Sequence, residues 1–217
     1  MKKRLPVLLV ILLVASLAAC AGSNPADPTE PATSDPAIST TPESTTTPES
    51  TAAPDESVSA GKTLVVFFSA TGTTKRVAEM IANKENADLY EIKAAQDYTA
   101  ADLNWNDNSS RTTREQNDKT ARPAIGSDPL SLDGYTRIYI GYPIWWGEEP
   151  RILDTFVESY GFDGITVIPF CTSGGSGIGR SGQNLAENAG SGNWLDGQRF
   201  SGSVSESEVE SWISTLQ

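Results

Sequence analysis

A short apolar segment followed by a turn rich in hydroxyl groups constrains the fold of this chain most strongly. Residues 64–74 read Leu-Val-Val-Phe-Phe-Ser-Ala-Thr-Gly-Thr-Thr. A continuous apolar run of this length is typical of a buried strand, and we expect a helix over residues 75–83. Backbone N–H groups and hydroxyls at such a turn converge beside the positive end of the helix dipole. The segment therefore predicts an anion site, and phosphate is the expected anion.

Strands and helices alternate along the rest of the chain. Further strands are expected at 88–93, 137–142, 164–170 and 197–200, and helices at 150–160, at 183–188 and from Ser205 onward. Alternation of this kind favours parallel strands joined by right-handed helical crossovers. We therefore predict an α/β, doubly wound sheet with helices on both faces. In such sheets ligands bind beyond the carboxyl ends of the strands.

Two further motifs directly follow apolar strands and so belong at the same end of the sheet as the first turn. The second motif, residues 142–147, contains two adjacent tryptophans, which point in different directions in a loop, so at least one is expected to be exposed unless a flat ligand covers it. The alternative is that both rings fill the gap between the loop and a helix. The third motif, residues 171–179, has four glycines that allow a ligand to approach the backbone. A merely flexible loop is the alternative there.

The amino-terminal sixty residues have the composition of an export signal and a tether. Residues 1–4 are basic, and the apolar segment at 5–19 is too short to span a bilayer comfortably. Small residues directly before Cys20 resemble the lipobox of bacterial lipoproteins, which implies cleavage there and lipid on Cys20; an ordinary secretory signal is the alternative. Residues 21–60 are rich in Pro, Thr, Ser and Glu and contain no Lys or Arg. They are expected to form a disordered tether before a domain at 61–217.

Composition disfavours several classes of function. The chain has no histidine, which removes the commonest metal ligand and general base, so metal catalysis and triad hydrolysis are poor interpretations. Residues 61–217 contain 13 basic and 21 acidic side chains, and their net charge of −8 argues against nucleic acid as a partner. Cys171 has no partner in the chain if Cys20 carries lipid. It is interpreted as a small apolar residue, with a redox thiol as the alternative.

Together the three motifs resemble those of the flavodoxin family, in its bacterial flavodoxin-like lipoprotein branch, over nearly all of residues 61–217. The resemblance implies a five-stranded sheet in the order 2-1-3-4-5, the order known for flavodoxins, with FMN bound at its switch point. Residues matching the phosphate turn are Ser69, Ala70, Thr71, Gly72, Thr73 and Thr74. Residues matching the loop that flanks the isoalloxazine ring are Pro143, Ile144, Trp145, Trp146 and Gly147. Residues matching the loop at the ring's polar edge are Thr172, Ser173, Gly174, Gly175, Ser176 and Gly177.

The resemblance also implies a function. Trp146 would be the stacking aromatic, and the Gly147 carbonyl would turn toward the flavin N5 when a semiquinone forms. The expected protein is a membrane-tethered, monomeric one-electron carrier that serves a redox protein or a quinone. An FMN-dependent NAD(P)H:quinone or flavin oxidoreductase is the alternative, because residues 143–146 and 150–153 also resemble the ring loop of quinone reductases. A third possibility is a binding module that has lost its cofactor.

A long polar insertion, residues 94–134, separates the second and third predicted strands. It is rich in side chains that form hydrogen bonds, and it lies near the loop end of the sheet. Two interpretations remain open at this point. The insertion is either a lid over the cofactor or a long surface loop that Trp105 anchors to the core.

Overall fold

The computed structural model describes residues 61–216. The predicted export signal, the lipid site at Cys20 and the predicted tether at 21–60 lie outside these residues. The described elements follow one another as β1 (Lys62–Phe68), α1 (Thr73–Glu85), β2 (Asp88–Ile92), α2 (Arg111–Asn117), β3 (Tyr135–Pro143), α3 (Arg151–Glu158), β4 (Thr166–Thr172), α4 (Ser181–Ala189), β5 (Asn193–Trp194), β6 (Gln198–Phe200) and α5 (Glu206–Ser214). Across this part of the chain, no helix combines the length and apolarity that a bilayer crossing needs.

The strands form one parallel sheet in the order β2-β1-β3-β4-β5, which confirms the predicted order. The predicted fifth strand is in two pieces, because β5 and β6 pair with successive parts of β4. Pro169 explains the interruption. The Val167 carbonyl accepts a hydrogen bond from the Leu195 N–H, so the backbone groups of Val167 face the fifth strand. Those of Pro169, two residues later, face the same way, but proline has no N–H to donate.

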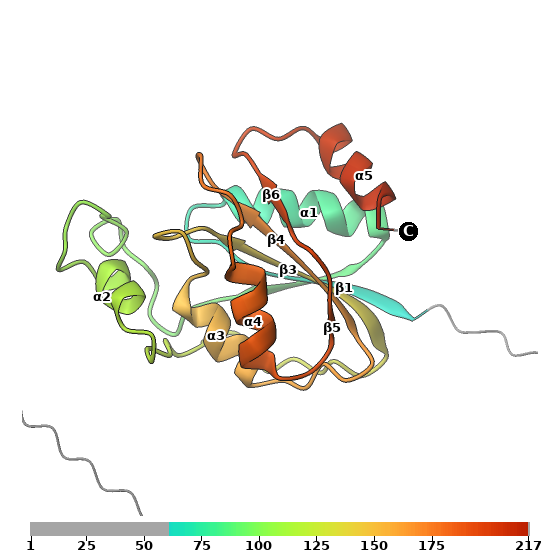
Figure 1. Ribbon diagram of the computed structural model, residues 1–217, viewed down its shortest axis with the longest axis horizontal. Coiled ribbons are helices and arrows are strands. Elements are labelled where there is room, and N and C mark those ends of the chain that lie inside the picture. The colour runs from blue at the N-terminus through green and yellow to red at the C-terminus, as the bar shows by residue number, and fades with distance from the viewer. Residues whose placement is uncertain (1–60, 217) are drawn as a thin grey trace, which may run out of the picture. The chain divides into compact units, whose positions relative to one another are not determined.

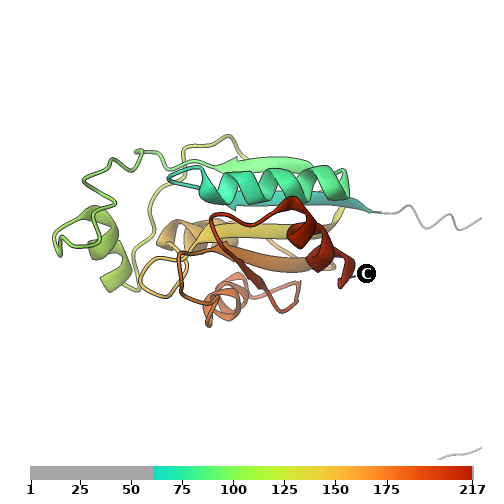
Figure 2. The same cartoon turned by 90° about the horizontal axis from the view of Figure 1, so that it is seen from above.

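Helices cover both faces of the sheet, as predicted (Figures 1 and 2). Helices α1 and α5 lie on one face, and α3 and α4 lie on the other. Strand β1 shows why both faces need covering: Val65 and Phe67 pack among residues of α1 and α5, whereas Leu64, Val66 and Phe68 pack on the opposite side. A strand that is apolar on both faces is stable only when helices bury both.

The insertion contains a helix, α2, that the sequence pattern did not predict. Its sequence, RTTREQN, has no apolar face. It is stabilised locally instead, because the Ser110 side chain accepts a hydrogen bond from the Thr113 N–H and Arg111 pairs with Glu115 at 2.6 Å. In Figure 1, α2 lies beyond the carboxyl ends of the strands and apart from both helical layers. The insertion is therefore at the loop end of the sheet, as expected.

Of the strand boundaries that differ from the predicted ones, the carboxyl ends of β3 and β4 affect the site. Strand β3 continues to Pro143, and β4 continues through Cys171 to Thr172. The reason is their pairing in register: Tyr142 lies opposite Cys171, and Pro143 lies opposite Thr172. The second and third motifs therefore begin inside the sheet, and their free loops start one or two residues later than expected.

Candidate ligand site

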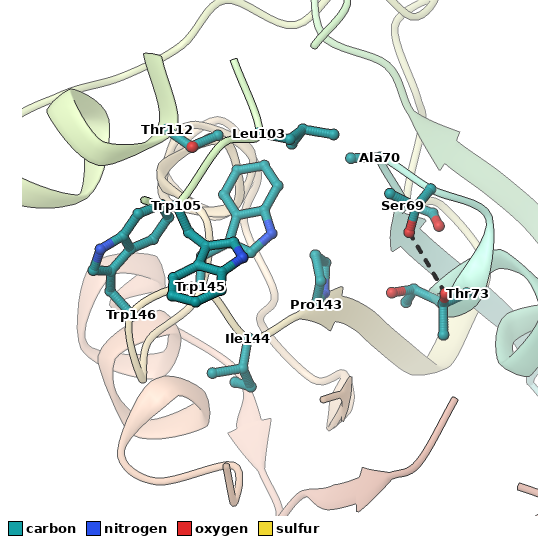
Figure 3. A pocket seen from close by; sticks show the side chains of 12 residues that line it. Ser69, Ala70, Thr73, Leu103, Trp105, Thr112, Pro143, Ile144, Trp145 and Trp146 are labelled. Atoms are coloured by element: carbon teal, nitrogen blue, oxygen red, sulfur yellow. Dashed lines mark hydrogen bonds between the residues drawn. The ribbon is translucent and has the colours of Figure 1, made fainter. Parts of the chain in front are cut away.

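A cavity of about 390 Å³ lies at the carboxyl ends of β1 and β3. The first turn, the second motif and the insertion all contribute to its walls. The lining residues are Ser69, Ala70, Thr71, Thr73, Thr74, Leu103, Trp105, Thr112, Pro143, Ile144, Trp145 and Trp146. Figure 3 shows the side chains of Ser69 and Thr73 on one side of the cavity and the indoles of Trp105, Trp145 and Trp146 gathered on the other. The cavity therefore has a hydroxyl end and an aromatic end.

The hydroxyl end is the turn between β1 and α1. Gly72 precedes the helix with φ at 86°, a left-handed conformation that glycine adopts without a steric penalty. No side chain caps α1, so the N–H groups of its first turn remain available as donors. The hydroxyls of Thr71 and Thr73 lie 3.5 Å apart beside them. Hydroxyls, free N–H groups and the helix dipole together make this end suitable for an anion.

Thr74 connects the first turn to the third motif. Its hydroxyl and that of Thr172 are 2.8 Å apart, and both residues are buried. The neighbouring Thr172 carbonyl accepts a hydrogen bond from the Ile144 N–H at 3.0 Å. The three predicted motifs are thus joined by hydrogen bonds at the end of the sheet.

The two tryptophans of the second motif point in different directions, as predicted. Trp145 is half-buried and lies edge-on to Phe68 and Tyr98, with ring centroids 5.6 and 5.3 Å apart. Trp146 is 45% exposed. The alternative in which both rings fill an internal gap is therefore wrong, and one indole is accessible to a ligand.

Trp146 occupies a tight turn. Trp145 and Glu148 exchange backbone hydrogen bonds of 2.9 and 3.0 Å, and the two residues between them, Trp146 and Gly147, have φ of 51° and 84°. Positive φ at both central positions is the pattern of a type I′ turn. A left-handed conformation costs a non-glycine residue about 1–2 kcal/mol. The turn therefore holds the backbone of Trp146 in a conformation that a residue with a side chain disfavours.

A buried charge cluster supports the base of this loop. The Arg151 guanidinium is 3% exposed; it contacts Glu148, lies 3.4 Å from Glu149 and lies 3.3 Å from Asp154. Three carboxylates thus surround one buried cation. Burial raises the pKa of Glu149 to about 7, and the negative charge of Asp154 adds to this, while the side chain of Asn184 and Arg151 oppose it. Glu149 is therefore partly protonated at neutral pH.

The insertion is fixed to the second motif by Gln116 of α2. Its Nε2 donates to the carbonyls of Trp145 at 2.8 Å and Glu149 at 3.1 Å. The backbone carbonyl of Gln116 accepts a hydrogen bond from the Arg151 guanidinium at 3.3 Å. Helix α2 and the tryptophan loop consequently form one connected structure.

Trp105 does not anchor the insertion, and that interpretation is wrong. The indole is 71% exposed and lines the cavity. Leu103 and Thr112 line the same wall, and the sequence patterns indicated none of the three as site residues. The only signal available was a large aromatic residue within a polar segment, because the contact with the cavity depends on how α2 docks.

The third motif lies beside the cavity without lining it. Residues 174–177 are exposed, whereas Ser173 is held by Arg199, which donates to its hydroxyl at 3.2 Å and its carbonyl at 2.6 Å. The motif is close to the tryptophan loop, since a Cβ placed on Gly179 would lie 3.5 Å from the Gly147 carbonyl oxygen. The interpretation as an unrestrained loop is thus wrong at its start, and the ligand contacts of Thr172, Ser173, Gly174, Gly175, Ser176 and Gly177 stay a prediction.

Cys171 is a buried part of the sheet. Its side chain is fully buried in β4, and burial raises the pKa of its thiol to about 12. A reactive thiolate is therefore not formed at neutral pH, which agrees with its interpretation as a small apolar residue. Among residues 61–216, no group of three or more His, Cys, Asp or Glu side chains is arranged to hold a metal ion.

The fold and cavity define a class of protein: a doubly wound α/β domain with a site for a ligand that is anionic at one end and flat and apolar at the other. The sequence matches the family model described as flavodoxin over residues 62–216. The chain belongs to the flavodoxin family.

Solved structures agree with this assignment. A candidate flavoprotein from Bacteroides uniformis is 48% identical, with 71% of this chain and 98% of that chain covered and a TM-score of 0.68. A candidate flavoprotein from Bacteroides eggerthii is 44% identical, with 72% and 98% covered and a TM-score of 0.67. A flavoprotein from Lactobacillus acidophilus in complex with FMN is 26% identical, with 71% and 99% covered and a TM-score of 0.55. No curated protein matches the sequence.

Proposed function

We propose that this domain binds FMN and transfers electrons one at a time. The observation that carries the proposal is the cavity with hydroxyls and a helix amino terminus at one end and indoles at the other. FMN has the matching parts, a phosphate and a flat tricyclic ring. The FMN complex of the Lactobacillus acidophilus relative supports the same ligand.

The residues present fit FMN by their chemistry. Ser69, Thr71 and Thr73 supply hydroxyl donors for the phosphate, and the first N–H groups of α1 add backbone donors. Trp145 and Trp146 would lie beside the flat ring and shield it from water. FMN, when bound, supplies the redox chemistry, and the protein sets its position and electrostatic environment.

The charge around the site supports a carrier of low potential. No Lys or Arg belongs to the described lining of the cavity, and residues 61–217 carry a net charge of −8. A negative field disfavours the addition of further negative charge to a bound ligand. Transfer of single electrons to a redox protein or a quinone is the function that this environment suits best.

We also propose that the domain works on the outer side of the bacterial membrane. The support is in the sequence: small residues precede Cys20 directly, and a segment without Lys or Arg separates it from the domain. Two or more acyl chains keep a protein on a bilayer, whereas one gives marginal binding. Incorporation of labelled fatty acid into the whole chain, and its loss in Cys20→Ala, would test the anchor.

The visible spectrum of the domain during stepwise reduction tests the FMN proposal. The segment from Gly61 on is suitable because both core clusters lie within it and because the Bacteroides relatives are covered over 98% of their chains. We expect a yellow protein, or uptake of added FMN, and reduction in two one-electron steps. A colourless protein that takes up no FMN would exclude the cofactor. Rapid bleaching by NADPH without a partner would show the alternative, a reductase.

A further inference from the structure

We propose that Trp105, on the insertion, is a ligand-binding residue that contacts the ring of the bound flavin. The proposal rests on FMN as the ligand and adds a third aromatic residue to the two in the tryptophan loop. Trp105 lies far from the first two motifs in the sequence, yet it lines the same cavity as Trp145 and Trp146 (Figure 3).

The exposure of Trp105 is the first argument. Its indole is 71% exposed, more than the 45% of Trp146. A large apolar side chain left in water at the mouth of a cavity usually marks a binding surface. Two exposed indoles on one cavity are explained together if one flat ligand covers both.

The rigidity of the segment is the second argument. Trp105 lies in a turn closed by hydrogen bonds from Asn104 N–H to Ala101 O and from Asp107 N–H to Asn104 O. The Asp107 carboxylate then accepts hydrogen bonds from the N–H and the hydroxyl of Ser109, at 2.8 and 2.7 Å. The indole is therefore carried on a closed turn instead of a free loop, and a ligand need not pay the full cost of ordering the backbone.

The position of this turn is fixed relative to the tryptophan loop. Thr112 of α2 donates from its hydroxyl to the Asp102 carbonyl at 2.6 Å, which connects the Trp105 turn to the helix. Gln116 of the same helix donates to the Trp145 carbonyl at 2.8 Å. Trp105 and Trp145 thus belong to one hydrogen-bonded structure, which fixes the insertion wall relative to the tryptophan loop.

The chemistry of the insertion wall indicates which part of the ligand it contacts. Leu103 and the Trp105 ring are apolar, and the Thr112 hydroxyl is occupied by the Asp102 carbonyl. This wall therefore offers no free hydroxyl to a phosphate. A flat apolar ring is the part of FMN that fits it.

The experiment measures binding of FMN and of riboflavin, which has the ring and lacks the phosphate, to the segment from Gly61 on. We expect Trp105→Ala to weaken the binding of both ligands by roughly tenfold, or about 1.4 kcal/mol, and Trp105→Phe to restore most of it. The control is Leu89→Ala, which shortens another exposed apolar side chain, 43% exposed and on β2, away from the cavity. It should bind both ligands like the wild type. Thermal unfolding of each variant checks that the fold is intact.

Tryptophan fluorescence gives a readout that does not depend on redox activity. Bound FMN should protect an indole from acrylamide quenching, and that protection should be smaller in Trp105→Ala. If the wild type binds FMN and Trp105→Ala binds both ligands equally tightly, the Trp105 assignment is overturned while the proposed function stands. If the wild type binds neither ligand, both proposals fail. Weaker binding of FMN with unchanged binding of riboflavin would also overturn the ring contact.

Discussion

The hydroxyl end of the cavity comes from one turn, residues 69–74, whereas the aromatic end comes from two segments, residues 103–112 and 143–146. The first end forms as soon as β1 and α1 are in place, because its donors belong to the turn between them. The second end depends on Gln116 and on the Arg151 cluster, which bring distant segments together. The comparison teaches that anion recognition is encoded locally here, while recognition of the ring depends on tertiary contacts.

Removal of the Arg151 guanidinium should have the largest effect on stability, because Arg151 belongs to the cluster that supports the aromatic end. In Arg151→Leu the buried carboxylates of Glu149 and Asp154 lose this cation, as does the half-buried Glu148. Loss of one partner from a buried ion pair costs about 3–5 kcal/mol. We expect a fall of that size in the free energy of unfolding, measured with urea. Arg180→Leu is the control, because this exposed arginine pairs with an equally exposed Glu187, and it should cost less than about 1 kcal/mol. Equal losses in the two variants would contradict a special role for the cluster.

The pH dependence of stability tests the same charge cluster around Arg151. The folded pKa of Glu149 is about 7, above its ordinary value of 4.5. The folded state therefore binds this proton more tightly than the unfolded state, so stability should fall as the pH rises from 4.5 through 7, by at most about 3 kcal/mol. Glu149→Gln should flatten this fall, as measured by urea unfolding across the range. The exposed Glu187→Gln should keep the slope of the wild type, and an unchanged slope in Glu149→Gln would refute the assignment.

Loss of one hydroxyl should affect ligand binding only at the hydroxyl end of the cavity. Thr73→Val removes a donor beside the start of α1, and one hydrogen bond to a charged group is worth about 1.5–3 kcal/mol. We expect FMN to bind more weakly by roughly tenfold or more and riboflavin to bind as before, both by flavin fluorescence titration. Thr136→Val changes an exposed residue near the start of β3, at the end of the sheet opposite the cavity, and should alter neither affinity. Equal weakening of both ligands would place Thr73 at the ring instead.

The smallest expected effect is in the tryptophan turn, where one substitution should raise stability and weaken ligand binding. Trp146→Gly relieves a left-handed conformation and should raise the free energy of unfolding by up to about 1 kcal/mol. The same change should weaken riboflavin binding, because it removes an exposed indole from the cavity. Trp105→Gly is the comparison, since among the described residues only Asn86 and Trp146 combine a side chain with positive φ. A stability gain in both variants would argue against strain at Trp146.

Much of the fold could be predicted because the strands carry their own signal. The apolar runs of β1, β3 and β4 are buried on both faces, so their composition alone indicates parallel strands at the centre of a sheet. Helix α2 and the division of the fifth strand could not be predicted in the same way. The first is stabilised by a cap and an ion pair without an apolar face, and the second reflects a missing N–H on the neighbouring strand at Pro169.

The sequence by itself determined the α/β class of the fold, the anion turn and the presence of an exposed indole beyond β3, because each depends on residues that are adjacent along the chain. The tertiary structure alone decided that Trp145 is half-buried while Trp146 stays exposed, and that Trp105 joins both at the cavity. Those outcomes depend on the two hydrogen bonds from Gln116 and on the packing of Trp145 against Phe68 and Tyr98, which link residues far apart in the sequence. No local pattern encodes such contacts, because they exist only after α2 has docked against the loop that follows β3.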